Sequence, residues 1–173
     1  MNIFELKIWD DERKLCTFYT VQWDRATDNE TDKFFAKYET IPGFEKITQQ
    51  LLSFILLSIG DDHGAVDTLF NRFENEVTGL PVHGRVRLGE FTYHYPSFRL
   101  RLYALKITEE IVVLFNGGEK DGPTNQISSL NVKWIEACQF ATRILEALRT
   151  GELLIDMVHR KLTDHKGLEE IIL

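Results

Sequence analysis

Phe98-Arg99-Leu100-Arg101-Leu102-Tyr103-Ala104 and Ile111-Val112-Val113-Leu114-Phe115 are the two stretches that decide the fold of this chain. The second is a continuous apolar run, which is typical of a strand buried on both faces. In the first stretch, apolar residues alternate with others, and successive side chains of a strand face opposite ways. We therefore predict two adjacent strands joined at Thr108-Glu109-Glu110. The alternation places Phe98, Leu100, Leu102 and Ala104 on the core face and Arg99, Arg101 and Tyr103 on the opposite face.

The residues before these strands predict a β-hairpin followed by a helix. Residues 3–8 alternate, residues 15–23 are rich in Thr, Tyr, Phe and Val, and a charged turn at 10–14 lies between them. Alternation together with β-branched or aromatic residues on both sides of a polar turn is typical of two paired strands. After an acidic loop, we expect Thr31 to cap a helix that ends near Pro42.

Two more helices are expected before the strands. Over Phe44–Ile59 the apolar residues recur at helical spacing, and Gly60 is expected to end that helix. The aspartates that follow can cap a short helix that reaches Phe73. From Val82 to Phe115 the chain is expected to form strands.

The residues after these strands predict a loop, a long helix and an amphipathic tail. Residues 116–123 combine Asn, Pro and several Gly, which favours turns. A helix is expected from Asn131 to Arg149, ended by Gly151. Residues 152–173 are expected to be helical in part. The apolar stripe of the long helix is predicted to consist of Ile135, Cys138, Ala141, Leu145 and Leu148.

Together these elements predict a single α+β domain over residues 1–173, with an N-terminal β-hairpin, helices, antiparallel sheet strands and a long C-terminal helix. We divide it into a hairpin extension (1–30), a core (31–121) and a C-terminal helical extension (122–173). Its two cysteines lie too far apart in sequence to suggest a disulfide framework or a metal site. No apolar run approaches the ~20 residues that span a bilayer, and no signal sequence opens the chain. A cytoplasmic location without a membrane partner is therefore expected.

Charge is distributed unevenly along the chain. Its 27 acidic and 20 basic residues give a net charge of −7, so the chain as a whole does not attract nucleic acid. Residues 79–106 are the exception, because they hold a single acid, Glu90. A local basic surface can bind phosphate even on an acidic protein. The basic residues of this segment are Arg85, Arg87, Arg99, Arg101 and Lys106.

The predicted face with Arg99, Arg101 and Tyr103 suits a phosphodiester. The forked guanidinium of arginine pairs with phosphate oxygens, and an aromatic ring can stack on a base. Arg85, Arg87, Arg99 and Lys106 are accordingly our candidate RNA-binding residues. The alternative is a solvated strand face whose arginines pair with nearby acids, and the scarcity of acids in this segment leaves both interpretations open.

The same strands carry a family pattern. It consists of an arginine-containing strand (Arg101-Leu102-Tyr103), a short turn (108–110), a very apolar strand (111–115) and then a basic residue, Lys120. In this the chain resembles the RelE/ParE-type toxins of bacterial toxin–antitoxin pairs, small α+β proteins of which the RelE branch cuts mRNA. The resemblance covers residues 31–121. It implies a RelE-like fold and, as partner, a small antitoxin protein, for example one with a helix-turn-helix.

The resemblance also implies an activity, the endonucleolytic cleavage of mRNA, free or on the ribosome, without metal or other cofactor. A ribose 2′-hydroxyl attacks the neighbouring phosphate, so the site needs a base, an acid and cations. The implied phosphate stabiliser is Arg101, with Arg99 in support and Lys120 as a second cation. The implied proton carriers are Tyr103 or His94, and histidine titrates nearest to neutral pH.

A non-enzymatic module that binds a protein partner, on a RelE-like or an unrelated α+β scaffold, is the alternative. It would be favoured if Arg99 and Arg101 were paired with acids from the acidic flanks. Other chemistry has less support in the sequence. Asp61-Asp62-His63 suits a turn and a helix cap better than a metal site, and Ser97 has no evident partner base.

Overall fold

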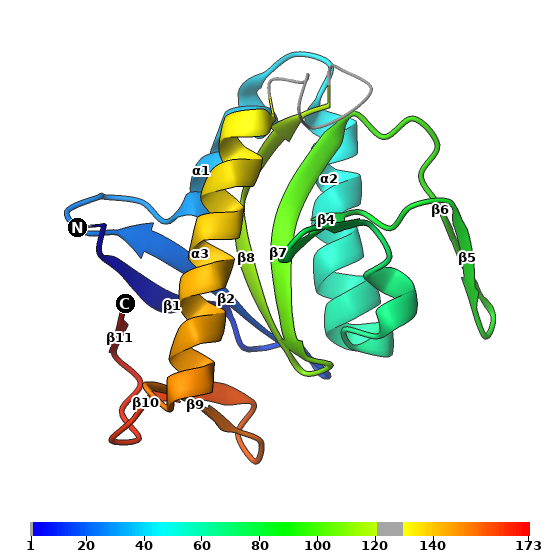
Figure 1. The fold of residues 1–173 in the computed structure, drawn as a ribbon. Helices are drawn as coiled ribbons and strands as arrows, with labels where there is room; N and C mark the ends of the chain where they lie inside the picture. The colour runs from blue at the N-terminus through cyan, green and yellow to red at the C-terminus, as the bar shows by residue number, and fades with distance from the viewer. Residues whose placement is uncertain (1, 121–129) are drawn as a thin grey trace.

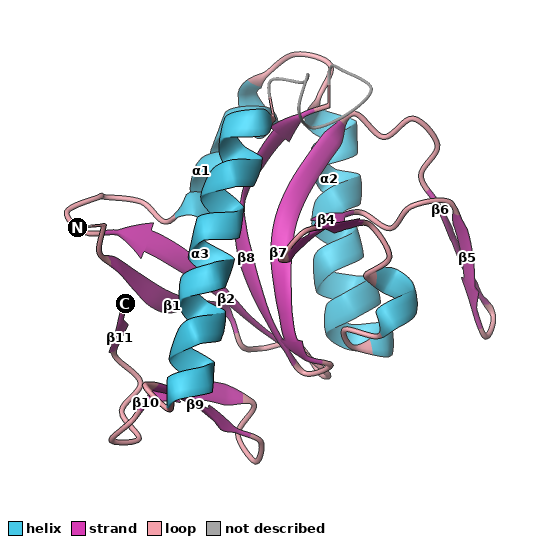
Figure 2. Cartoon of the chain, viewed as in Figure 1, coloured by secondary structure: helices cyan, strands magenta, loops and turns pink. Residues whose placement is uncertain are grey.

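A mixed seven-stranded sheet runs through the middle of the molecule (Figures 1 and 2). The computed structural model describes residues 2–120 and 130–173. The strand order is β11 (Ile171–Ile172), β1 (Phe4–Asp10), β2 (Thr17–Trp23), β8 (Ile111–Glu119), β7 (Leu100–Thr108), β4 (Val77–Leu80) and β3 (Phe73–Glu74). Neighbouring strands are antiparallel except β2 and β8, which are parallel. The predicted α+β class is confirmed, with a mixed rather than a purely antiparallel sheet.

Helices cover both faces of the sheet. Helices α1 (Glu30–Thr40) and α2 (Glu45–Ser53) lie on one face, and α3 (Asn131–Thr150) lies on the other (Figure 1). A π-helical segment, η1 (Phe54–His63), continues α2, and a 3-10 turn, η2 (Asp67–Leu69), follows. Two small hairpins stand outside the sheet, β5 (Arg85–Leu88) with β6 (Phe91–His94) and β9 (Leu153–Asp156) with β10 (Lys161–Asp164). Within the described ranges, no helix is long and apolar enough to cross a membrane.

Strand β8 lies in the centre of these layers, as its apolar run predicts. The strand is buried from Ile111 to Gly118. Leu114 packs in the core beneath α1 and α2, whereas Val113 and Phe115 pack in the core beneath α3. A strand that is apolar on both faces needs cover on both faces, and this explains why the helices are divided between the two sides.

Phe140 of α3 forms the centre of the second core. Its ring lies 4.8 Å from Phe4, 4.5 Å from Trp23 and 5.7 Å from Phe115, measured between ring centroids. These rings come from β1, β2 and β8, so one helix residue packs against three strands. The N-terminal hairpin, expected as an extension, therefore lies inside the sheet.

Helix α1 is fixed to the sheet by Thr31, which is not its cap. The cap is Asn29, whose side chain accepts a hydrogen bond from the Asp32 N–H at 2.8 Å. The buried Thr31 hydroxyl donates to the carbonyl oxygens of Leu114 and Phe115, at 3.0 and 3.1 Å. The predicted cap was wrong by two residues, and Thr31 points into the sheet instead.

The predicted second helix continues past Gly60 instead of ending there. Gly60 lies inside η1, where an added Cβ would come within 2.7 Å of the Arg13 Cγ. Its carbonyl accepts a hydrogen bond from the Leu15 N–H at 2.7 Å, so this glycine permits close approach of the first hairpin. The helix ends at Gly64, which has a φ of +75°. The expected third helix is only the turn η2, and Phe73 lies in β3.

The predicted loop after Phe115 begins later than expected, because β8 continues to Glu119. Gly117 lies directly against β7, where an added Cβ would collide with the Arg101 carbonyl oxygen. Glycine is used here for a close approach of two backbones and not for a turn. Residues 121–123 of the predicted loop lie outside the described residues.

The C-terminal tail forms strands, not the expected helix. Helix α3 ends at Thr150, and Gly151 reverses the chain with a φ of +81°. The Leu162 N–H of β10 donates to the Tyr19 hydroxyl oxygen at 2.8 Å, and β11 pairs with β1. The apolar stripe of α3 also differs from the prediction, since Ile135 and Leu145 are 45% and 42% exposed. The buried stripe consists of Ala137, Phe140, Ala141, Ile144 and Ala147.

We expect the substitution Thr31→Val to lower the free energy of unfolding by about 1–3 kcal/mol, because it leaves two buried carbonyl oxygens without their donor. Urea unfolding followed by circular dichroism measures the change. Thr40→Val is the matched control, because the Thr40 hydroxyl is exposed and bonds only within its own helix. An equal loss in both variants would contradict a special role for Thr31.

A second prediction concerns Glu30, which is 2% exposed at the start of α1. Burial alone would raise the pKa of this carboxyl, but hydrogen bonds from Lys33 (2.7 Å) and Asn116 (3.2 Å) outweigh it and lower the pKa below 4.5. A lowered pKa stabilises the fold above the unfolded value, and that stability is lost as the pH falls through the folded value. Glu30→Gln should therefore flatten the decline of unfolding free energy below pH 4.5, measured by urea titrations at several pH values. An unchanged slope would contradict this assignment.

Candidate nucleic-acid interface

Arg101 forms an ion pair at the edge of the sheet. Its guanidinium donates to the Glu74 carboxylate at 2.7 Å, and the two side chains are 9% and 15% exposed. Glu74 belongs to β3, so the pair reaches from β7 across β4 to the last strand. Charge-assisted hydrogen bonds are stronger than neutral ones, and this pair is more buried than an ordinary surface salt bridge.

The face of β7 that carries Arg101 and Tyr103 is largely covered by α3, and 9% of the Arg101 side chain remains exposed. Tyr103 on the same face is fully buried in the core that surrounds Phe140. The predicted alternation is correct from Leu100 to Ala104, but Arg99 lies against Phe44 of the other core and does not share the face of Arg101. Of the two open interpretations, the paired arginines fit the structure better than a free basic face. The helix needed to cover β8 also covers its neighbour β7.

Two further cations lie around the ion pair. Arg72 and Arg101 both lie against Gly79, where an added Cβ would come within 2.9 and 2.8 Å of their Cδ atoms. Lys120 directly follows β8, and its backbone N–H donates to the carbonyl oxygen of Arg99, the residue before β7, at 2.7 Å. Arg72, Arg101, Lys120 and Glu74 are called the basic cluster below. Three positive charges and one carboxylate meet in it.

Two cations of this cluster have lowered pKa values. Desolvation lowers the pKa of both Arg72 and Lys120, and the charge of Arg101 lowers both further, while Glu74 acts in the opposite direction. Within residues 2–120 and 130–173, neither Arg72 nor Lys120 forms an ion pair with a carboxylate. Crowded cations of this kind suit a bound anion, which would relieve their mutual repulsion.

Tyr103 lies beneath the cluster. Burial raises the pKa of its hydroxyl, and the nearby Glu74 raises it further, so the phenol remains protonated. Its oxygen is buried, close to the side chains of Glu74 and Arg101. In this position Tyr103 cannot act as a base, and it supports Arg101 from below instead of facing solvent.

Helix α3 holds the acidic member of the cluster. The Trp134 indole donates to the Glu74 carbonyl oxygen at 3.0 Å, which ties β3 to the helix. Sequence reasoning missed Glu74 and Arg72 because both lie in the acidic N-terminal part of the chain, before the basic segment. The one sequence feature that could have linked them is their spacing, since residues 72 and 74 lie on the same face when the backbone is extended.

Arg99 and Lys106 do not join the cluster. The Arg99 guanidinium donates to Glu119 at 2.5 Å and lies 4.6 Å from the centre of the Phe44 ring, which belongs to the core beneath α1 and α2. Lys106 donates to Asp67 at 2.5 Å near the other end of β7. Both Arg99 and Arg101 are thus paired with glutamates from outside the basic segment, which is the arrangement expected of a protein-binding module.

The remaining candidates lie on the hairpin of β5 and β6. Arg85 and His94 are opposite each other in its register, and Arg87 is opposite Thr92. All four side chains are exposed. His94 therefore lies beside Arg85 on this hairpin, which is a sheet separate from the one that carries Arg101.

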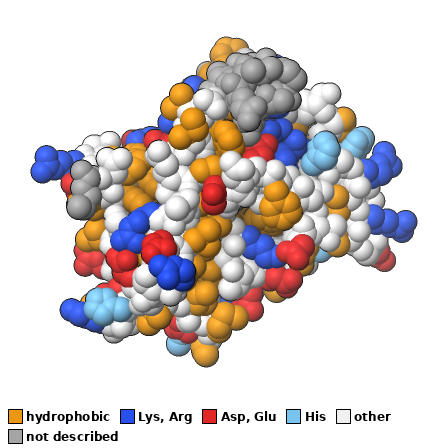
Figure 3. All heavy atoms as spheres, in the orientation of Figure 1, with side chains coloured by type: hydrophobic (Ala, Val, Ile, Leu, Met, Phe, Trp, Pro, Cys, Tyr) orange, Lys and Arg blue, Asp and Glu red, His pale blue; other side chains and the backbone are white. Residues whose placement is uncertain are grey.

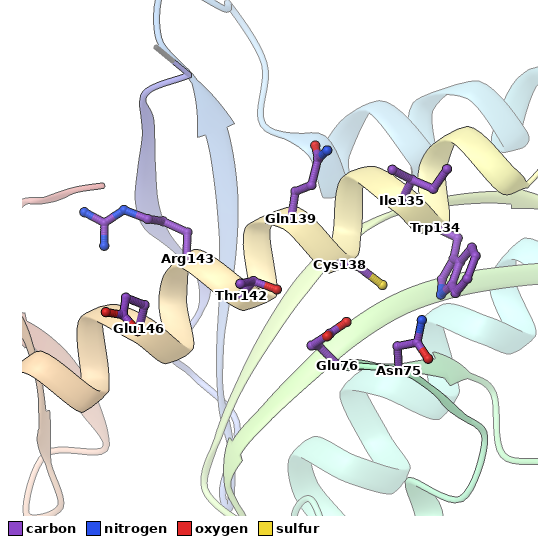
Figure 4. Close-up of a pocket in the computed structure, with 9 residues that line it drawn as sticks. All are labelled: Asn75, Glu76, Trp134, Ile135, Cys138, Gln139, Thr142, Arg143 and Glu146. Carbon is purple, nitrogen blue, oxygen red and sulfur yellow. The ribbon is translucent and has the colours of Figure 1, made fainter.

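A groove of about 660 Å³ runs between α3 and the turn from β3 to β4 (Figure 4). In Figure 4, Trp134 and Cys138 point from the helix toward Asn75 and Glu76. The groove is lined by Asn75, Glu76, Trp134, Ile135, Cys138, Gln139, Thr142, Arg143 and Glu146. Among the described residues that line it, the one cation is Arg143, which is paired with Glu152 at 2.8 Å. These residues carry no excess of positive charge and do not suit a phosphate.

We expect Arg101→Ala to lower the free energy of unfolding by about 1–3 kcal/mol, because it removes a charged donor from the largely buried Glu74 carboxylate. Arg101→Ala combined with Glu74→Ala should cost less than the sum of the two single changes. Thermal unfolding of the three variants completes this double-mutant cycle. Strict additivity would mean that the pair contributes nothing of its own.

The described residues contain no group of three or more His, Cys, Asp or Glu side chains that could hold a metal ion. No family model, curated protein or solved structure matches the chain.

Proposed function

We propose that the chain is a RelE-like endoribonuclease, the toxin of a toxin–antitoxin pair, and that the basic cluster binds the phosphodiester it cuts. The observation that carries this proposal is that three cations and one carboxylate lie together where β7 begins and β8 ends. Arg101, Tyr103 and Lys120, which the resemblance implies as catalytic residues, all lie at or beneath that point. The substrate is mRNA in the cytoplasm, free or on the ribosome.

The cluster holds the groups that cleavage of RNA requires. Glu74 takes the proton of the ribose 2′-hydroxyl, whose oxygen then attacks the adjacent phosphorus. The bond from phosphorus to the 5′-oxygen breaks, and Lys120 gives that oxygen a proton. The products are a 2′,3′-cyclic phosphate and a 5′-hydroxyl end. Arg72 and Arg101 stabilise the negative charge that builds on the phosphate oxygens.

The lowered pKa of Lys120 suits this role. A general acid works best when its pKa is close to the pH of the reaction, and desolvation together with the charges of Arg101 and Arg72 moves Lys120 in that direction. Tyr103 is too deeply buried to touch the substrate. In this proposal it positions Arg101, and His94 has no part in the proton transfers.

A second candidate function, a protein-binding module without catalysis, is favoured by the pairing of Arg99 with Glu119 and of Arg101 with Glu74. The groove of Figure 4 would then receive the partner, and its apolar wall beside Trp134 and Ile135 is consistent with that use. The small antitoxin expected as partner fits either candidate.

Lys120→Ala separates the two candidates. We expect it to lower the rate of RNA cleavage by about a hundredfold or more, the usual contribution of a general acid, with little change in thermal stability because Lys120 is partly exposed. The assay follows the cleavage of a labelled mRNA by purified protein, with and without ribosomes. Lys166→Ala is the matched control, because it removes one lysine charge at an exposed turn and should leave the cleavage rate unchanged.

Wild-type protein that leaves mRNA intact under both conditions would exclude the endoribonuclease. Equal rates for wild type and Lys120→Ala would show that the basic cluster is not the site of cleavage.

A further inference from the structure

The hairpin of β5 and β6 stands out from the body of the molecule, at the right-hand edge in Figure 1. Its two faces differ. Val86 and Tyr93 on the inner face are buried and pack into the core beneath α1 and α2. Tyr93 also lies 2.8 Å, oxygen to nitrogen, from the ring Nε2 of His63 at the end of η1. The hairpin is thereby anchored to η1, and its other face is left to solvent.

The outer face of the hairpin is basic. Arg85 and Arg87 lie two residues apart on one strand, about 6.6 Å along its direction, and His94 is opposite Arg85. Across the described parts of the chain, no carboxylate forms an ion pair with Arg85 or Arg87, and the Arg87 Nε donates only to the Gly89 carbonyl oxygen at 3.2 Å. This arrangement leaves both guanidinium groups available to a ligand.

The base of the hairpin is joined to the basic cluster through two adjacent residues. The Asn71 side chain bonds both the backbone N–H and the carbonyl oxygen of His83, at 2.8 and 2.9 Å. Its neighbour Arg72 belongs to the cluster and donates to the Pro81 carbonyl oxygen at 3.3 Å. In Figure 3, Lys, Arg and His side chains gather at the right-hand edge, where Figure 1 places the hairpin.

We propose that the outer face of this hairpin binds the backbone of the RNA strand that continues from the basic cluster. This inference rests on the proposed function, and it adds that the substrate is an RNA longer than the two nucleotides joined by the cut phosphodiester. The hairpin contributes affinity and no chemistry. Arginine forks pair with phosphate oxygens in two parallel hydrogen bonds, and phosphate contacts position a nucleic acid without selecting its sequence.

RNA fits this face better than an acidic protein does. The two arginines repeat along an extended strand with a spacing close to that between successive phosphates of a nucleic acid. The base of the hairpin is also connected to the cluster, because Asn71 binds His83 and its neighbour Arg72 is a member of the cluster. The rest of the chain carries a net negative charge, which disfavours contact of nucleic acid with that part of the protein.

The test is the double variant Arg85→Ala/Arg87→Ala. Its binding to a labelled single-stranded RNA with 2′-O-methyl riboses, which cannot be cleaved, is measured by fluorescence anisotropy over a range of salt concentrations. We expect Kd to rise about tenfold and the slope of log Kd against log salt to fall by about 1.4, since each phosphate contact on a single strand contributes about 0.7. Cleavage of a dinucleotide, which has one phosphate, should be unchanged.

Arg25→Ala/Arg149→Ala is the control, because both of its arginines are exposed outside the hairpin and their loss changes the net charge equally. An unchanged Kd and salt slope in the hairpin variant would overturn this inference, whether or not the wild type cuts mRNA. Equal weakening in the control would also overturn it, because bulk charge would then explain the effect. Equal weakening toward polyglutamate as a second probe would assign the face to acidic proteins instead. Weakened RNA binding in a protein that cuts no RNA would support the hairpin's role and exclude only the proposed cleavage.

Discussion

The requirement to bury β8 on both faces governs the rest of this structure. Its apolar run has no polar side, so one layer of helices must lie beneath it and another above it. The parallel pairing of β8 with β2 draws the N-terminal hairpin into the same sheet. Phe140 then packs against aromatic rings of three strands, β1 and β2 from the N-terminal hairpin and β8 from the middle of the chain.

The same burial determines where charge can lie. Cations on β7 cannot occupy the middle of the sheet, because α3 covers that face, so Arg101 is confined to its end beside β3. There Arg72 and Lys120 approach it from neighbouring segments, and Glu74 offsets one of the three charges. The cluster is a product of the packing as much as of the basic segment itself, because three of its four members lie outside that segment in sequence.

Patterns of local periodicity predicted much of this fold, and they failed where distant contacts decide the outcome. The run Ile111–Phe115 and the helix from Asn131 were predicted well, since burial and helical spacing act within one element. Gly60 and Gly117 misled the prediction. Each was taken for an end or a turn, but each permits close approach, of Arg13 in one case and of the Arg101 backbone in the other. Glu74 was missed because its partner lies across the sheet.

The parallel pairing of β2 with β8 has a consequence for the synthesis of the chain. Thr17 is paired with Ile111, so the first hairpin leaves the ribosome long before its partner strand exists. Until then one edge of β2, with the aromatic side chains of residues 18 and 19, lacks its neighbour. Pairings between distant segments form slowly, and nascent chains with exposed strand edges are prone to aggregate. The nascent N-terminal hairpin is thus prone to aggregate until β8 has been synthesised.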